Sequence, residues 1–264
     1  MRRNLAWLIV GLLFVGLTAA RQSAHGEDFR VDTEVFRGNS KEPIAEILTI
    51  FQSGNVYDFQ LAGPQEITIF EPRRGVVTLL NVEHKKKAVV ETLELINAAI
   101  SMQAAAAAGS NPVFAAAAQP AFEVKSSEFK QNNSDFTKLV FTGNTLKYTV
   151  TGQQAHTPGA ANDYRYFSDL SARLSSLRVG GLPAGARLEV NAEIAKHGLL
   201  PTEVERIIQE TRFGKSEVRT QHLVVWKLSQ EDRKRIDTAC GYLVDQKFET
   251  IDFNQFCALV RNGK

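Results

Sequence analysis

The chain has 264 residues, of which 44 % are hydrophobic and 23 % are charged, and its formal net charge is +2. This apolar content and balanced charge exclude a disordered tail, and the length allows one large domain or two small ones. So small an excess of basic residues gives no compositional support for nucleic-acid binding.

The first twenty residues have the layout of a secretory signal peptide. Arg2 and Arg3 precede an apolar stretch, Leu5 to Leu17, and three small residues follow it. The stretch is shorter than the roughly 20 apolar residues of a membrane span, which favours a cleaved signal over an uncleaved anchor helix. We therefore expect an exported protein, periplasmic or extracellular. Removing residues 1–20 leaves 29 basic and 29 acidic side chains, so we expect no nucleic-acid partner and no stable membrane insertion.

Short strands separated by turns are predicted from Phe29 to Val82. Tyr57, Phe59 and Leu61 alternate with polar residues, as do Ile67 and Ile69, and this two-residue period is typical of half-buried strands. Turn residues separate the runs at 53–55, 63–64 and 71–75. Such strands pair antiparallel as a meander, and residues 84–91 would add an edge strand guarded by lysines 85–87.

A helix is predicted after Thr92, which we expect to be its N-cap. Its buried face would consist of residues that recur at three- and four-residue steps: Val89, Leu93, Ile96 and Ile100. Two alanine tracts follow, and we expect 104–120 to be a frayed helix end and a loose loop, because alanine brings little apolar area.

A second set of strands begins near Phe122. Leu146, Tyr148 and Val150 alternate with polar residues after the tight turn at 143–144, which predicts a hairpin. A third strand pair, 202–211 and 218–228, would be joined through Gly214. Helices are predicted after residues 162–163, where Asn or Asp can serve as the cap, from 183 to 197, after the capping box of Ser229 and Asp232, and after Asp252.

Strands and helices are grouped rather than alternating, which predicts the α+β class with a mainly antiparallel sheet and a C-terminal helical hairpin. We expect residues 21–264 to form a single domain. Cys240 and Cys257 fall on apolar faces of the two last helices. A disulfide between them would suit an exported protein, and two buried free thiols are the alternative.

Catalytic and cofactor motifs are not found. Gly214-Lys215-Ser216 lacks the first glycine of a phosphate loop, since Gln209 stands at that position. The five histidines have no metal-ligand spacing, and no Gly-x-Ser-x-Gly sequence occurs. We therefore expect no enzyme, no metal and no cofactor.

The strand series between Phe29 and Thr92 resembles that of LolA-like exported bacterial carriers, and also that of secreted bacterial proteins of unknown function. The resemblance rests on Ile47 to Phe51, on Gly54-x-Val56-Tyr57-Asp58-Phe59, on Glu66 to Pro72 and on Gly75 to Leu80. It implies an open antiparallel half-barrel whose concave face is covered by helices and holds an acyl chain. It transfers no individual binding residue.

Two functions follow as hypotheses. The first is a non-catalytic envelope protein that binds a lipid or other apolar ligand, and the second is a structural or interaction module with a filled core and no small ligand. In the first case the alternating apolar residues would line the concavity: Tyr57, Phe59, Leu61, Ile67, Ile69, Leu146, Tyr148 and Val150. An ordinary packed core would give the same alternation.

Overall fold

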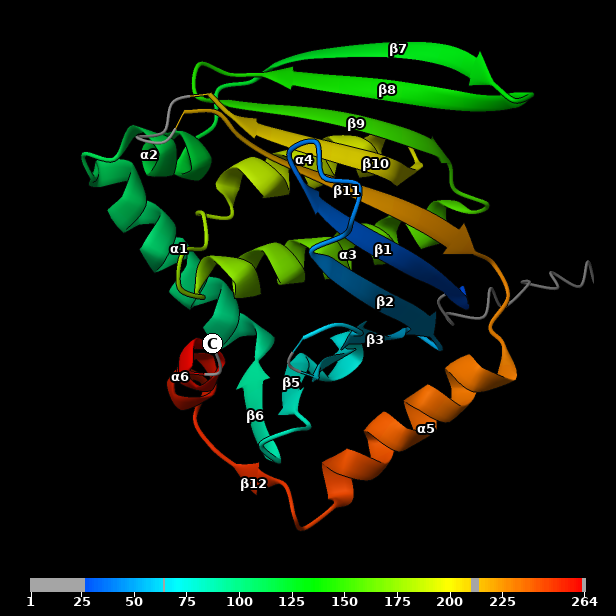
Figure 1. Ribbon diagram of the computed structural model, residues 1–264, viewed down its shortest axis with the longest axis vertical. Helices are drawn as coiled ribbons and strands as arrows, with labels where there is room; N and C mark the ends of the chain where they lie inside the picture. The colour runs from blue at the N-terminus through cyan, green and yellow to red at the C-terminus, as the bar shows by residue number, and fades with distance from the viewer. Residues whose placement is uncertain (1–26, 64, 210–213, 263–264) are drawn as a thin grey trace, which may run out of the picture.

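The computed structural model describes residues 27–63, 65–209 and 214–262, so the predicted signal peptide lies outside the described residues. Within these ranges the chain forms twelve strands and six α-helices (Figure 1). The strands are β1 (Phe29–Arg37), β2 (Ala45–Gln52), β3 (Asn55–Gln60), β4 (Glu66–Glu71), β5 (Val76–Asn81), β6 (Lys86–Glu91), β7 (Glu123–Gln131), β8 (Ser134–Thr142), β9 (Leu146–Gln154), β10 (Leu199–Ile208), β11 (Ser216–Val225) and β12 (Glu249–Thr250). The helices are α1 (Thr92–Ala108), α2 (Pro112–Ala118), α3 (Pro158–Ser176), α4 (Gly185–Lys196), α5 (Gln230–Val244) and α6 (Phe253–Asn262).

All twelve strands belong to one open sheet, in the order β12-β6-β5-β4-β3-β2-β1-β11-β10-β9-β8-β7. Every neighbouring pair is antiparallel except β12 with β6. Two meanders, β1–β6 and β7–β11, are joined where β1 pairs with β11, with Arg30 opposite Val225. The predicted α+β class with a mainly antiparallel open sheet is confirmed.

Five helices cover one face of the sheet, here called the inner face, and α5 covers the other, the outer face (Figure 1). Successive side chains of a strand point to opposite faces. In β2, for example, Phe51 packs in an inner cluster, whereas Leu48 and Ile50 pack in the outer one. Where α5 covers it, at β2 to β5, the sheet is therefore apolar on both faces, in contrast to the one-sided burial typical of a meander.

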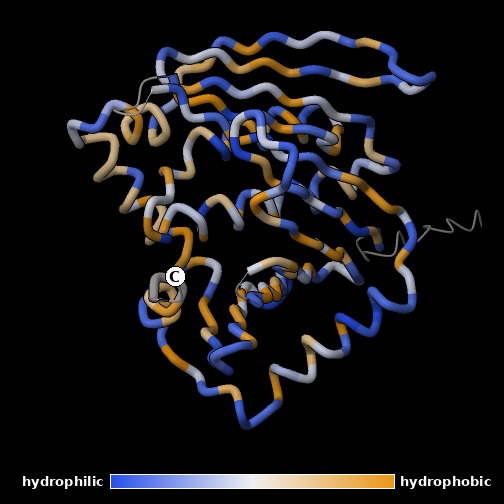
Figure 2. The backbone as a smooth tube through the Cα atoms, viewed as in Figure 1, coloured by the Kyte–Doolittle hydropathy of each residue, from blue (hydrophilic) through white to orange (hydrophobic). Residues whose placement is uncertain are grey.

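Three apolar clusters make up the core. The first inner cluster packs Tyr164, Phe167, Leu170 and Leu174 of α3 against β1, β2, β4, β5 and β6. The second packs α4 against β8, β9 and β10, and the outer cluster packs α5 against β2 to β5. Figure 2 shows that α5 carries mostly hydrophilic residues, as expected for a helix with one buried side and one in water.

The two C-terminal helices form as predicted but pack on opposite faces of the sheet. Ile236 of α5 belongs to the outer cluster and Phe256 of α6 to the first inner cluster. Between them the chain passes around the sheet edge, where β12 pairs parallel with β6. Cys240 and Cys257 lie on these separate helices and are free thiols, so the predicted disulfide is not formed.

The alanine-rich segment differs from the prediction. It is helical in α1 and again in α2, where the side chain of Asn111 caps the helix by accepting bonds from two backbone N–H groups. Small residues let α2 approach α4 closely: a Cβ at Gly185 would lie 2.3 Å from the carbonyl oxygen of Ala118. Alanine thus supplies close backbone packing here instead of apolar area.

The face that α1 buries is also not the predicted one. Leu95 and Ala99 are buried, whereas Leu93 and Ile100 are 65 % and 58 % exposed. Val89 belongs to β6 and is exposed as well. Thr92 is not the cap either, because Glu91 takes that position without a side-chain bond.

Candidate functional site

A band of polar side chains crosses the inner face where the two meanders meet. Five adjacent strands contribute to it: Arg206 from β10, Thr220 and His222 from β11, Thr33 from β1, Thr49 from β2 and Asp58 from β3. The band separates the two inner apolar clusters. Because desolvating polar groups is unfavourable without full compensation, polar residues at inward positions of a sheet indicate a functional site.

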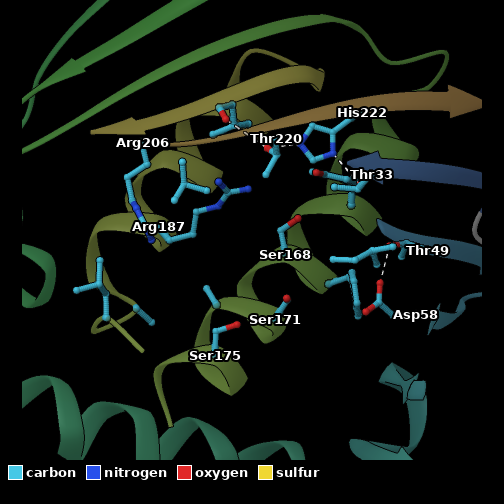
Figure 3. Close-up of a pocket in the computed structure, with 18 of the residues that line it drawn as sticks. Thr33, Thr49, Asp58, Ser168, Ser171, Ser175, Arg187, Arg206, Thr220 and His222 are labelled. Atoms are coloured by element: carbon cyan, nitrogen blue, oxygen red, sulfur yellow. Dashed lines mark hydrogen bonds between the residues drawn. The ribbon is translucent and has the colours of Figure 1, made fainter. Parts of the chain in front are cut away.

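A partly open cavity of about 310 Å³ lies between this band and the helices. Helix α3 presents Ser168, Ser171 and Ser175 to it, at the three- and four-residue spacing of one helix face. Helix α4 contributes Arg187. Figure 3 shows Arg187 and Arg206 at one end of the cavity and Asp58 at the other. The rest of the lining is largely apolar: Ile47, Tyr148, Tyr164, Phe167, Ala172, Leu182, Pro183, Ala184, Val204 and Val218.

His222 is held as a neutral ring. Its Nδ1 lies 2.9 Å from Thr33 Oγ1, and its Nε2 lies 2.9 Å from Thr220 Oγ1. Since the Thr220 hydroxyl donates to the carbonyl oxygen of Val204, it accepts from His222 Nε2–H, and Nδ1 accepts from Thr33. Burial, together with the charge of Arg187, lowers the pKa of His222 to about 3. Both nitrogens are occupied, so His222 fixes the band and takes up no proton near neutral pH.

Asp58 carries the acidic end of the cavity. The hydroxyl of Thr49 donates to Asp58 Oδ1 at 2.6 Å. Burial raises the pKa of Asp58 to about 6, and this rise is opposed in part by the Thr49 hydrogen bond and the charge of Arg178. The carboxylate is therefore mostly ionised at neutral pH but protonates in mild acid.

The eight residues predicted to line a concavity lie on two faces of the sheet. Tyr57, Phe59, Ile67 and Ile69 belong to the outer cluster under α5, and Leu61 is 45 % exposed. Leu146, Tyr148 and Val150 belong to the second inner cluster, and of all eight only Tyr148 lines the inner cavity. Phe59, Leu61 and Ile67 instead line a smaller outer groove of about 240 Å³ beside α5.

Sequence patterns alone do not identify most residues of the polar band. Thr49 and Asp58 are single polar positions in apolar strands, and Thr33 stands in a polar run between Asp32 and Glu34. In sequence all three therefore resemble the solvent side of a half-buried strand. The signal that could have found the site is the serine row of α3 together with Arg206, which stands between the apolar positions Val204 and Ile208. Within the described residues, no group of three or more His, Cys, Asp or Glu side chains is placed to hold a metal ion.

In the part of the chain that the structure describes, no helix has the length and apolar character needed to cross a membrane.

No protein-family model matches the sequence, and no curated protein matches it. Among solved structures, the chain is similar to PNGF-II in two crystal forms, with a TM-score of 0.39 and 10 % and 11 % identity. The alignments cover 90 % of this chain but only 33 % and 34 % of those chains, so this chain spans about a third of their length.

A LolA superfamily protein from Nitrosomonas europaea is similar at a TM-score of 0.25 and 6 % identity, over 78 % of this chain and 89 % of that one. At these values the similarities, including the LolA-like one noted in the strand pattern, are weak and establish neither a family nor an activity.

Proposed function

We propose that this protein is an exported, non-catalytic binding protein of the bacterial envelope that holds a lipid-like ligand in the cavity of the inner face. The observation that carries the proposal is the cavity itself, about 310 Å³ of space between α3, α4 and the sheet that the apolar clusters leave unfilled. This volume lies at the lower end of the ~300–1,000 Å³ found for small-molecule sites. The mixture of apolar walls and a polar band suits an amphiphile.

Binding without catalysis is supported by the state of the polar groups. His222 donates to one threonine and accepts from another, and its lowered pKa makes it a weak base. Among the described residues, none of the cavity serines is hydrogen-bonded to His222 or to Asp58, so no serine is paired with a base that could activate it.

The test is direct detection of the ligand. The full chain is expressed with its leader, purified, and extracted for lipid mass spectrometry, and fatty acids are then titrated into the delipidated protein by calorimetry. The cavity is blocked in a Ser171→Phe variant, and Arg165→Phe on the exposed side of α3 is the matched control. Saturable binding that Ser171→Phe removes and Arg165→Phe keeps supports the proposal. Absence of both co-purified lipid and saturable binding contradicts it.

A second function, that of an interaction module without a small ligand, is favoured by two exposed surfaces. All nine residues of β7 are exposed at one end of the sheet, and Leu93 and Ile100 form an exposed apolar stripe on α1. This function predicts that, in a strain lacking the chromosomal copy, Leu93→Glu impairs complementation while Ser171→Phe does not. The binding-protein function predicts the opposite pattern.

A further inference from the structure

The charges within the cavity are arranged asymmetrically. Arg187 and Arg206 lie at one end, Asp58 lies at the other, and His222 is neutral between them (Figure 3). Two guanidinium groups in one partly dehydrated space repel each other unless an anion lies between or beside them. The arginine end of the cavity thus carries an excess of positive charge.

Arg187 has no anionic partner among the described residues. Within them it donates no hydrogen bond and forms no ion pair within 4 Å, although its positive charge contributes to the pKa values of His222, Tyr164 and Asp169. Asp169, the carboxylate in that group, already accepts from Asn191 at 2.9 Å and lies 3.7 Å from Arg165. The guanidinium of Arg187 therefore keeps its donors for something that enters the cavity.

Arg206 occupies a position that the sheet would otherwise give to an apolar residue. Its neighbours on the same side of β10 are Val204 and Ile208, and both are buried in the second inner cluster. Its Nε–H is buried and has no hydrogen-bond partner. A buried donor without an acceptor costs about 1–3 kcal/mol, which a bound acceptor would recover.

From these three observations we propose that the ligand of the cavity carries an oxyanion, a carboxylate or a phosphate monoester, bound by Arg187 and Arg206, with its apolar chain along the α3 wall. This inference rests on the proposed function and narrows it to anionic amphiphiles. Arginine suits the role because its planar fork of donors matches both carboxylate and phosphate oxygens. Asp58, at the far end, disfavours a second anionic group there.

The test compares four unbranched probes of eight carbons each: octanoate, octyl phosphate, octanol and octylamine. Calorimetry at neutral pH is expected to show binding of at least one anionic probe at least about tenfold tighter than octanol, because charge-assisted bonds contribute about 1.5–3 kcal/mol. The ratio of octanoate to octyl phosphate affinity tells which oxyanion the site prefers. Arg187→Gln and Arg206→Gln should each weaken the anionic probes about tenfold while changing octanol less than about threefold.

Arg219→Gln is the matched control, because it removes the same charge from β11 on the opposite face, where its guanidinium lies 4.6 Å from the ring centroid of Phe36. Octanol binding as tightly as the anions, or octylamine binding more tightly, would overturn the anion inference and leave the proposed function standing. Failure of all four probes to bind would count against both. The comparison among probes uses the unmodified protein, so the inference stays testable even where a variant fails to fold.

Discussion

Replacing Asp58 with asparagine should stabilise the protein, and the gain should depend on pH. The pKa of Asp58 rises from 3.8 to about 6 on folding, with burial as the main cause. Each pKa unit corresponds to ~1.4 kcal/mol, so the ionised carboxylate lowers the free energy of unfolding by about 3 kcal/mol. The asparagine side chain would be neutral at every pH and would still offer an oxygen to the Thr49 hydroxyl.

The sign follows from proton binding in the two states. Between about pH 4 and pH 6 the folded protein holds a proton on Asp58 that the unfolded chain has lost, so stability falls as pH rises through that window. Below about pH 4 both states are protonated and the wild type and Asp58→Asn should be nearly equal. Above about pH 7 the variant should be more stable by the full amount.

Urea unfolding at a series of pH values measures this difference directly. The exposed Asp237 on α5 supplies the control, since Asp237→Asn changes the same charge without a buried environment. A stability difference for Asp58→Asn that stays constant from pH 4 to about pH 8 would refute the reasoning, because it would mean that folding leaves the proton affinity of Asp58 unchanged.

Three further outcomes are expected. Gly185→Ala should lower the melting temperature in a calorimetric scan, because its new Cβ would lie 2.3 Å from the carbonyl oxygen of Ala118, and a wild-type value would show that α2 can move away. Asp232→Ala should lower the free energy of unfolding by about 2 kcal/mol in urea at neutral pH, since it removes the buried carboxylate that completes the capping box with Ser229 and accepts a hydrogen bond from Arg30; a change below about 0.5 kcal/mol would contradict that role. Titration of the denatured, unreduced protein with a thiol reagent should find Cys240 and Cys257 both free, whereas a disulfide would leave none to react.

The hairpins and the start of α5 could be predicted because the turn and capping residues that determine them are close together in the sequence. The turn at 143–144 joins β8 to β9, the capping box of Ser229 and Asp232 begins α5, and the third strand pair forms as β10 and β11. Each depends on a few neighbouring residues with a two-residue period or a fixed spacing.

The face to which each strand residue points could not be predicted. Alternation shows that Tyr57 and Phe59 share one side and that Tyr148 and Val150 share one side, but it does not show whether the two sides are the same. They are opposite: Tyr57 and Phe59 pack under α5 in the outer cluster, whereas Tyr148 and Val150 pack in the second inner cluster.

The polar cavity could not be predicted either, because the residues that line it are far apart in the sequence. Thr33 meets His222 only through the pairing of β1 with β11, and Arg187 reaches the cavity from α4, which lies in sequence between β9 and β10. Nothing in the local sequence of either strand indicates that pairing. The site becomes recognisable only when the whole sheet order is known.

The junction of β1 with β11 also constrains the order in which the protein can fold. Each meander can form from hairpins between neighbouring strands. The two meanders join only when β1 pairs with β11, which places Arg30 opposite Val225. Pairings between segments so far apart in sequence close late and slowly, because the entropy of a large loop is lost before the contact is gained. The cavity spans that junction, so we expect it to be assembled late in folding, after nearly the whole chain has emerged.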